Sequence, residues 1–590
     1  MSLPDRKKYA GDTRRLLLAF DIGTTFSGIS YSILDPGIIP EIRPVTRYPC
    51  QEHVGGDSKI PTVIYYDSAG KICAIGAETL KEGIEQDAEE NGWTKAWWFK
   101  LHLRPKPQTT SASVRQVDEA LPPLPPSKTV VQLFRDYMKY LLECAKKYIS
   151  DSHGQTVWTS LQNNIIFVLT HPNGWGGPQQ GQMRQAAIQA SLVPNTEDGR
   201  SRINFVTEGE ASLHFCLSNG LALANTQQSG VLIVDAGGGT VDLTAYCSLP
   251  DYSFEEIAIP QCHFQGAAFV TMRAKKFFEK LLSGTRFSDD VETLTMRFDR
   301  NTKHVFRKDD EPHHIQFGNH RDRDPSLNIR GGRLTLTGCD VAKFFEPSIS
   351  CIVEAIKAQK SAAHVPIQSV FLVGGFSASS WLFDKVRERI EPLGLSVSRP
   401  DAHVNKAVSN GAVSFYLDSA VTSRVSPRTY GISVYYPYDS SDPDHRKRGH
   451  LVEIHCATRE PVLHEGFSTI LPKDTRVRTS QEFRCSFSRQ AVERRSLNCL
   501  RATILAYSGL QKSPVWIDSD PLNYPTACTV EVDTTSLPVQ MTTSATGARY
   551  FEISFEIILL FGLTELQAQI AYRQNGQEKR GRAQVIYEGN

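Results

Sequence analysis

The sequence predicts an α/β region followed by an antiparallel β domain. Short apolar runs with the length of buried strands end in glycine-rich turns, and segments with helical periodicity lie between them. After about residue 420, apolar and polar residues alternate instead, which indicates strands with one buried face. At roughly 100–200 residues per domain, the 590 residues are enough for about three to five domains or lobes.

The composition argues against several classes of partner. The 65 Lys and Arg residues balance 64 Asp and Glu residues, so no strong net field attracts the whole protein to nucleic acid or to an anionic membrane. The longest apolar runs, such as Ile557–Phe561, have the length of strands and not of a membrane helix. We therefore expect no nucleic acid and no membrane among the partners. The charged N-terminus lacks the apolar core of a secretory signal, which favours a cytoplasmic protein, with the nucleus as a second compartment.

The N-terminal elements follow from the apolar pattern. Residues 1–13 are polar and are expected to form a flexible tail. Leu16–Phe20 is a short apolar run that predicts a buried strand. The chain then turns at Asp21–Thr25 and returns along Ile29–Leu34, which predicts a hairpin with a Gly/Thr tip. Ile60–Tyr66 predicts a further strand.

A proline-rich segment, residues 105–127, separates these strands from the next elements. Its run Leu121–Pro126 favours polyproline II, which we interpret as a surface loop and not as an SH3 ligand. Val130–Tyr148 and Gln180–Ser191 have the periodicity of helices, and Ile165–Thr170 is a fully apolar strand between them.

Two further apolar strands end in glycine-rich turns. Val231–Val234 continues into Asp235–Asp242, and Val370–Val373 ends at Gly374-Gly375. Residues 284–330 are polar and rich in charge, which predicts a peripheral, variable insert. Lys406–Tyr416 has a helical pattern.

The C-terminal region, residues 425–590, reads as an antiparallel β domain. Phe551–Ile557 alternates strictly between apolar and polar residues. Leu566–Arg573 and Ala583–Tyr587 flank Asn575-Gly576, and Asn-Gly favours the positive φ angles of a type I′ hairpin turn.

The glycine-rich turns carry the chemistry. Glycines let the backbone approach phosphate oxygens closely, and successive N–H groups can form a nest for an anion. An aspartate beside such a turn suits a hydrated Mg²⁺ ion, which prefers a few carboxylates, water and substrate phosphates. Asp21–Thr25 alone would be an ordinary turn, whereas the pattern of Asp235–Asp242 is far more specific. Neither is a P-loop or a Rossmann fingerprint.

In this order, the motifs resemble the Hsp70-like branch of the actin-like ATPase superfamily, and the resemblance spans roughly residues 14–420. Two segments resemble phosphate loops, one resembles the adenosine-binding segment, and two resemble the connecting segments of the family. In that order they are Asp21–Gly28, Asp235–Asp242, Phe371–Ser377, Val206–Leu213 and Asp401–Phe415.

The resemblance implies a two-lobed, ribonuclease H-like domain over residues 14–420, with ATP or ADP and Mg²⁺ at the base of a central cleft. Residues 284–330 would be a variable insert, and residues 425–590 would take the place of a peptide-binding β domain without a lid. It also implies slow hydrolysis of ATP to ADP and phosphate. Polypeptide would then be a partner of the β domain, and co-chaperones stay unidentified.

Site roles carry over from the family residue by residue. Asp21 and Asp235 would hold Mg²⁺ through water, and Glu208 with Asp235 would orient the attacking water. Lys100 would lie at the γ-phosphate, although Lys95 and Arg104 compete for this role. The catalytic set is Asp21, Lys100, Glu208, Asp235 and Thr240. The nucleotide-binding set is Gly23, Thr24, Thr25, Phe26, Gly237, Gly238, Gly239, Asp242, Gly266, Lys303, Gly374 and Gly375.

Several of these residues also have ordinary interpretations. Glu208 could be an acidic residue at a helix start, Asp242 a turn former, and Lys303 a solvated helix charge. Pro172 and Arg184 resemble the residues that couple nucleotide state to domain movement, but the stretch between them is longer than in the family.

The chain departs from the family at the adenosine segment. Ala378 stands where chaperones stack an arginine on adenine, and Phe376 replaces a small polar residue. Loss of a stacked guanidinium removes a cation–π contribution of about 0.5–2 kcal/mol, unless Phe376 or a neighbour compensates. Asp418–Val425 also lacks the leucine cluster of the chaperone linker.

The sequence therefore predicts an ATP-binding, slowly hydrolysing Hsp70-like protein that engages polypeptide through its C-terminal domain. The first alternative is an ATP-binding scaffold with negligible hydrolysis, which Ala378 and the unusual linker favour. A small-molecule kinase of the same fold is a weaker alternative, because the connecting segments and the β domain are chaperone-like.

Overall fold

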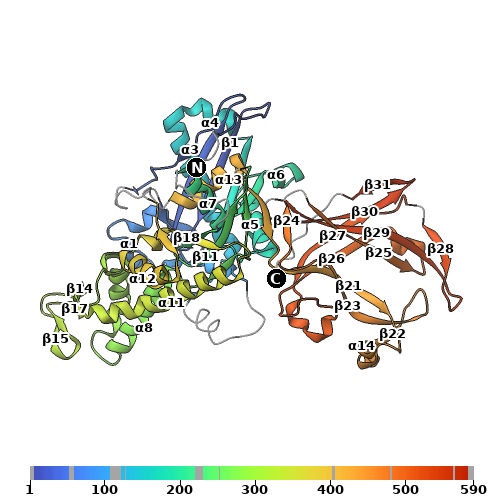
Figure 1. The fold of residues 1–590 in the computed structure, drawn as a ribbon. Coiled ribbons are helices and arrows are strands. Elements are labelled where there is room, and N and C mark those ends of the chain that lie inside the picture. The colour runs from blue at the N-terminus through green and yellow to red at the C-terminus, as the bar shows by residue number, and fades with distance from the viewer. Residues whose placement is uncertain are drawn as a thin grey trace. The chain divides into compact units, whose positions relative to one another are not determined.

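The structure is a computed structural model that shows a mixed α/β protein (Figure 1). Contacts divide the chain into two compact units: unit 1 takes most of the chain up to Val421, and unit 2 combines the C-terminal region from Thr422 with the short segment Trp175–Gln182. The structure describes residues 6–51, 59–105, 121–126, 128–219, 230–251, 253–400, 406–478, 481–537, 539–562 and 565–581.

The first sheet of unit 1 is built around one hairpin. Strands β1 (Arg15–Ile22) and β2 (Phe26–Leu34) pair antiparallel, and β8 (Ile165–His171) then runs parallel to β1. Next to β8 lies β9 (Ile203–Thr207), also parallel. Leu16–Phe20 is completely buried, and such burial on both faces explains the unbroken apolar run. Two short strands pair with β2, namely β3 (Arg43–Pro44) and β4 (Ile60–Pro61).

The second sheet repeats this order of strands. The hairpin β10 (Gly230–Ala236) and β11 (Val241–Ser248) is antiparallel, and β18 (Ile367–Val373) runs parallel to β10. Beyond β18 lies β19 (Ser396–Ser398), again parallel. The two hairpin tips therefore occupy equivalent places in the two sheets. The further partners of β11 are β12 (Phe254–Glu256) and β13 (Gln261–His263).

Helices fill the connections of unit 1. Several of them start with a side-chain cap, as at Thr129, whose hydroxyl accepts the backbone N–H of Gln132. The main helices are α3 (Val130–His153), α5 (Gly177–Gln189), α7 (Glu208–Ser218), α8 (Ala267–Leu282), α11 (Gly338–Ala362), α12 (Ser380–Ile390) and α13 (Ala407–Asp418).

Two small antiparallel sheets complete unit 1. The first has the order β6-β5-β7, and the 3₁₀ turn Phe99–Leu103 that follows β7 carries Lys100. The second has the order β14-β17-β16-β15 and is formed by the polar insert. Their strands are β5 (Val63–Tyr66), β6 (Ile72–Ile75), β7 (Thr94–Trp97), β14 (His313–Gln316), β15 (Arg323–Asp324), β16 (Ile329–Arg330) and β17 (Arg333–Leu336).

Unit 2 consists mainly of two sheets, with the orders β22-β23-β21-β26-β27 and β25-β29-β30-β31, and every strand pair in them is antiparallel. A shared apolar core includes Ile432, Ile504, Val530, Ile557 and Leu559. The strands are β21 (Thr429–Pro437), β22 (Val452–Ile454), β23 (Pro461–Leu471), β25 (Glu482–Ala491), β26 (Cys499–Tyr507), β27 (Thr526–Asp533), β28 (Gln540–Thr543), β29 (Arg549–Gly562), β30 (Glu565–Gln574) and β31 (Gln577–Arg580).

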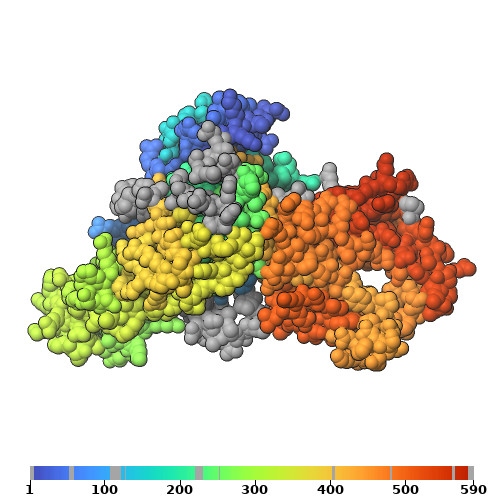
Figure 2. Space-filling model, viewed as in Figure 1, coloured from blue at the N-terminus to red at the C-terminus, as the bar shows by residue number. Residues whose placement is uncertain are grey.

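The space-filling view shows a narrow opening through unit 2, above the surface of helix α14 (Pro443–Lys447) (Figure 2). The turn between β28 and β29 meets the loop between β22 and β23. Thr546 donates its hydroxyl to the carbonyl of Thr458 at 2.7 Å, and the Ala545 N–H donates to Glu460 at 3.1 Å. These bonds join the two sheets of unit 2 at one end.

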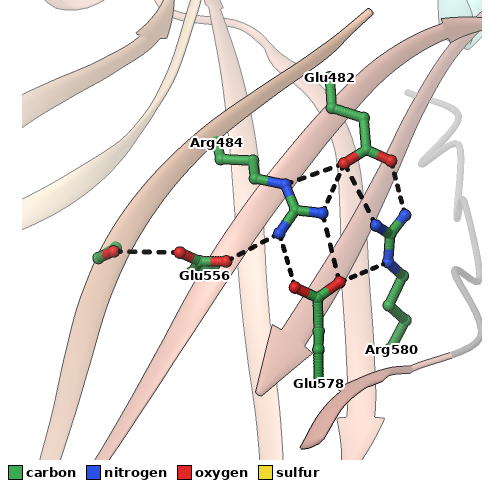
Figure 3. A network of polar contacts seen from close by, with 6 residues as sticks. Glu482, Arg484, Glu556, Glu578 and Arg580 are labelled. Carbon is green, nitrogen blue, oxygen red and sulfur yellow. Dashed lines mark hydrogen bonds and ion pairs between the residues drawn. The ribbon is translucent and has the colours of Figure 1, made fainter. Parts of the chain in front are cut away.

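An exposed network of charges lies on the second sheet of unit 2 (Figure 3). Arg484 of β25 contacts Glu482, Glu556 and Glu578, and Arg580 of β31 contacts Glu482 and Glu578. The hydrogen bonds and charges of the arginines hold the pKa of the Glu578 carboxyl at about 2, well below its ordinary value. The guanidinium groups of Arg484 and Arg580 therefore both have carboxylate partners.

The elements correspond to the predicted ones with a few differences. Ile60–Tyr66 is interrupted at Thr62, whose N–H donates to the carbonyl of Thr25 and whose hydroxyl meets Ser27. The predicted C-terminal hairpin turns at Asn575-Gly576 with φ angles of 53° and 79°. Its returning strand starts at once, at Gln577, since a two-residue turn pairs the residues that flank it. Ala583–Tyr587 lies outside the described residues, as does most of the proline-rich loop.

No helix in the described part of the chain combines the length and the apolar character that a membrane crossing requires. The polar start of the chain also makes contacts. Arg6 forms two hydrogen bonds with Asp418 at 2.8 Å, and Tyr9 exchanges backbone hydrogen bonds with Gly37 and Ile38.

Candidate nucleotide site

The two hairpin tips meet each other in unit 1. The tip between β1 and β2 carries Thr24 and Thr25, and the tip between β10 and β11 carries Gly238 and Gly239. A Cβ atom on Gly238 would lie 2.2 Å from Thr25 Oγ1, and one on Gly239 would lie 2.2 Å from Thr24 Oγ1. Only glycine allows this approach, so the tertiary fold brings both predicted phosphate loops together at these glycines.

The carbonyls of the second loop cap a helix. The backbone N–H groups of Gly266, Ala267 and Ala268, at the start of α8, donate to the carbonyls of Gly239, Gly237 and Gly238 at 2.8–3.2 Å. In a trans peptide unit, the carbonyl and the following N–H point in opposite directions. The N–H groups that follow these three carbonyls therefore point away from α8. Three successive N–H groups with a common direction can form a nest for a phosphate.

Two lysines stand among the acidic residues. Lys59 Nζ donates to Asp21 Oδ2 at 2.7 Å, and the Thr170 hydroxyl donates to Asp21 Oδ1 at 3.1 Å. Lys100 is almost fully buried and donates to Glu208 at the start of α7. Burial lowers the pKa of Lys100, but the charges of Glu208 and Asp21 outweigh this effect and raise it, so the ammonium form is favoured.

Lys100, Lys95 and Arg104 were the candidates for the cation at the γ-phosphate. Of these three, Lys100 contacts a predicted catalytic residue, Glu208. The ammonium group of Lys95 lies over the Trp97 ring, 5.2 Å from its centre, and burial lowers its pKa. Arg104 donates to the carbonyl of Leu101 at 2.8 Å.

The two aspartates of the second loop are deeply buried. Burial, together with the charge of Glu208, raises the pKa of Asp235 to about 7 and also raises that of Asp242. Asp235 Oδ2 accepts the hydroxyl of Ser212 at 2.7 Å, and Asp242 Oδ1 accepts the N–H of Asn173 at 2.7 Å. Burial is the main cause of both raised pKa values, and the neighbouring charge of Glu208 adds to it.

These groups fit a hydrated Mg²⁺ ion. Asp21 and Asp235 are the carboxylates that would hold it through water, and the charge of Asp21 contributes to the raised pKa of Asp235. Asp242 Oδ2 is buried and has no hydrogen-bond partner among the described residues. A nearby cation would lower the energy of all three carboxylates.

The third glycine turn lies against the second loop. Gly374 has φ = +85°, and a Cβ atom on it would lie 2.2 Å from Asp235 Oδ1. Gly375 then opens a 3₁₀ turn that ends at Ala378. Phe376 is only 4% exposed and stacks on Phe345 with ring centres 6.0 Å apart. Phe376 belongs to the core, so it does not compensate for the missing arginine by stacking on a base.

The remaining predicted residues have local partners. Lys303 is buried, pairs with Asp299 and donates to Thr271 at 3.2 Å, so the structure places it in an ion pair beside α8. Phe26 is 41% exposed at the tip of the first hairpin. A Cβ atom on Gly23 would lie 2.3 Å from the Phe26 carbonyl oxygen.

The predicted coupling residues, Pro172 and Arg184, have local partners. Arg184 donates to the carbonyls of Arg200 and Ile203, at 2.8 and 2.9 Å, and its guanidinium lies over the Phe205 ring. The carbonyl of Pro172 accepts a hydrogen bond from the His171 ring at 2.9 Å.

Sequence reasoning missed four residues that touch the predicted carboxylates. Lys59 and Thr170 contact Asp21, Ser212 contacts Asp235, and Asn173 contacts Asp242. The sequence offered a signal for Thr170, because it is the polar residue at the end of the apolar run Ile165–Thr170. No local pattern marks Lys59, whose position beside Asp21 depends on the pairing of β4 with β2.

Comparisons with known proteins find distant relatives of the chain. No protein-family model matches the chain. The chain is similar to heat shock 70 kDa protein 12A of Mus musculus, with 23% identity over 512 residues that cover 72% of both chains. It is 23% identical to the Homo sapiens protein of the same name, with the same coverage, and to Homo sapiens heat shock 70 kDa protein 12B over 71% of both chains. The chain is thus a distant homologue of these heat shock 70 kDa proteins.

Proposed function

We propose that this distant Hsp70 homologue binds ATP and ADP with Mg²⁺ at the two hairpin tips and hydrolyses ATP slowly. The observation that carries the proposal is the glycine loop Gly237–Gly239, whose carbonyls accept the N–H groups at the start of α8, so that the N–H groups that follow them point away from that helix. It lies against Thr24 and Thr25, whose hydroxyls add donors for a phosphate chain.

The chain's own residues supply the parts of a hydrolytic site. Lys100 places a positive charge beside Glu208, where it would stabilise the transferring phosphoryl oxygens. Glu208 and Asp235 would orient the attacking water. Thr240 and Asp242 would hold the second loop in shape.

Bound Mg²⁺ would neutralise charge on the phosphates and position them for in-line attack. Asp21 and Asp235 are the residues that would hold it through water. In the same site, Lys59 neutralises part of the charge of Asp21.

The first test is ATP binding and single-turnover hydrolysis, with Asp235→Ala beside the wild type. We expect the wild type to convert bound ATP to ADP and the variant to retain binding but lose turnover by at least about tenfold. Asp384→Ala is the matched control, because Asp384 is an exposed aspartate on α12 that pairs with Arg387. Equal turnover in both variants would rule out the assigned role of Asp235.

A second candidate is a scaffold that binds ATP without turning it over. The burial of Phe376 and the absence of an arginine at Ala378 favour it, since neither residue can stack on adenine. Measurable ATP binding with no ADP formed in a single-turnover experiment would select this candidate.

We also propose that unit 2 binds extended polypeptide. Its antiparallel sheets follow the nucleotide-binding region in the chain, and an opening runs through the unit (Figure 2). A fluorescent unfolded peptide should bind the full chain and change its ATP turnover. An absence of both effects would leave unit 2 without this role.

A further inference from the structure

The small sheet of the polar insert carries a row of arginines. In the register of its strands, Arg323 of β15 is directly opposite Arg330 of β16, and Arg330 is directly opposite Arg333 of β17. Arg333 is opposite Gln316 of β14, to which it donates a hydrogen bond at 2.9 Å. Directly opposite residues share one face of a sheet, so the three arginines form a single row across three strands.

The face that carries this arginine row is exposed. The opposite face is apolar and lies in the core of unit 1 through Ile315, Ile329, Leu334 and Leu336. All three arginines are exposed. The other residues that alternation places on the arginine face are Gln316, Thr335 and His314.

The four strands contain a single carboxylate, that of Asp324, and alternation places it on the apolar side, opposite Ile329. It accepts hydrogen bonds from the N–H and hydroxyl of Ser326. Asp322, in the loop before β15, accepts the N–H of Asn319 and lies 4.0 Å from Arg286. In the described part of the chain, none of the three arginines forms an ion pair.

This arrangement opposes the stability of the sheet, because like charges directly opposite each other are unfavourable. Unit 2 shows the contrasting case: Arg484 and Arg580 also reach over an exposed sheet face, but Glu482, Glu556 and Glu578 surround them (Figure 3). The arginine row lacks such a balance inside the protein. A ligand from outside can supply the missing carboxylates.

We propose that the arginine row binds an acidic segment of a partner protein. Each guanidinium offers a fork of donors that matches a carboxylate, whereas the flat row provides no pocket for a small anion. Opposite residues lie about 4.5–5.5 Å apart, close to the spacing of about 5–6 Å between acidic side chains at i and i+4 on a helix. Three arginines in a chain of net charge +1 would neutralise few phosphates, which argues against nucleic acid.

The test is fluorescence anisotropy of a labelled glutamate-rich peptide with the full-length protein. We expect binding that weakens as salt increases, and a loss of at least about tenfold in the triple variant Arg323→Gln, Arg330→Gln and Arg333→Gln. The matched control removes three exposed arginines that pair with acids elsewhere: Arg387→Gln, Arg495→Gln and Arg501→Gln. It has the same net charge and should bind the peptide like the wild type.

Thermal unfolding separates this role from a structural one. Removal of like charges should leave the melting temperature of the triple variant unchanged or higher, whereas a structural role would lower it. No peptide binding by the wild type, or an equal loss in the control, would overturn the proposal. Preference for a single-stranded RNA of equal charge over the peptide would also overturn it. If the triple variant is unstable, Arg330→Gln alone removes the centre of the row and repeats the comparison.

Discussion

At the scale of single residues, the raised pKa of Asp235 makes the folding stability of the protein depend on pH. Burial and the charge of Glu208 raise its pKa to about 7, so the folded chain holds a proton that the unfolded chain releases at lower pH. The folded state therefore loses stability as pH rises from about 4 to about 7. Asp235→Asn should raise the melting temperature at about pH 8 without Mg²⁺, and the gain should vanish near pH 4. A pH series of thermal melts checks this, and a gain that is independent of pH would contradict it.

A substitution at Gly238 tests whether ATP binding requires the close contact between the two glycine-rich loops. A Cβ atom there would lie 2.2 Å from Thr25 Oγ1, while one on Gly237 would meet its nearest neighbour, the Thr240 carbonyl oxygen, at 3.2 Å. Both glycines have φ angles that alanine can adopt, so only the contact differs. Gly238→Ala should weaken ATP binding by about tenfold or more, and Gly237→Ala by much less. Titration calorimetry measures both. Equal affinities would mean that the loops separate when nucleotide binds.

At the scale of elements, helices α7 and α13 cross at backbone distance. A Cβ atom on Gly411 of α13 would lie 1.7 Å from the carbonyl oxygen of Ala211 in α7. Gly411→Ala should therefore force the helices apart and destabilise the fold by about 1–3 kcal/mol. Urea unfolding measures this loss. Gly449→Ala is the control, because nothing lies within 4 Å of that site, and its stability should match the wild type.

The charge network of unit 2 acts at the same scale, because it joins β25 to β31 (Figure 3). These groups are exposed to water, so salt should screen their attraction. Arg484→Met should lower the melting temperature at low ionic strength, and the difference should shrink as sodium chloride is added. A difference that does not depend on salt would mean that Arg484 acts by packing over the sheet.

At the scale of the whole chain, an ion pair joins residues near the start to residues near the boundary between the units. Arg6 donates twice to Asp418 at the end of α13, and Ser414 donates to the same carboxylate at 2.6 Å. Burial by itself would raise the pKa of Asp418, but these hydrogen bonds outweigh the effect of burial, so the pKa of Asp418 is lowered. The pair lies in unit 1 and is mostly buried, with side chains 20% and 15% exposed.

Arg6→Ala should destabilise unit 1 by roughly 1.5–3 kcal/mol at neutral pH, since it leaves a buried carboxylate without its charged donor. Proteolysis should also cleave the N-terminal residues sooner. Arg14→Ala is the control, because Arg14 and Asp35 form an exposed pair of little expected value. A similar effect in both variants would contradict a special role for Arg6.

The sequence by itself determined the local elements and the order of the motifs. Strands such as β1, β8 and β10 were predictable because completely buried strands are apolar without interruption. The hairpin tips were predictable because glycines and threonines follow these strands directly. The types of residue in the nucleotide site followed from a resemblance, which the distant homology to heat shock 70 kDa proteins supports.

Only the tertiary structure decided which of these residues meet. Lys59 and Asp21 come together through the pairing of β4 with β2, and no pattern in the sequence encodes that register. The sequence left open whether Phe376 compensates for the missing arginine, whereas in the structure Phe376 packs on Phe345, because the strand before it ends inside the core. The arginine row exists only in the register of three short strands. Contacts between residues distant in sequence depend on packing of the whole chain, whereas local patterns report only burial and turns.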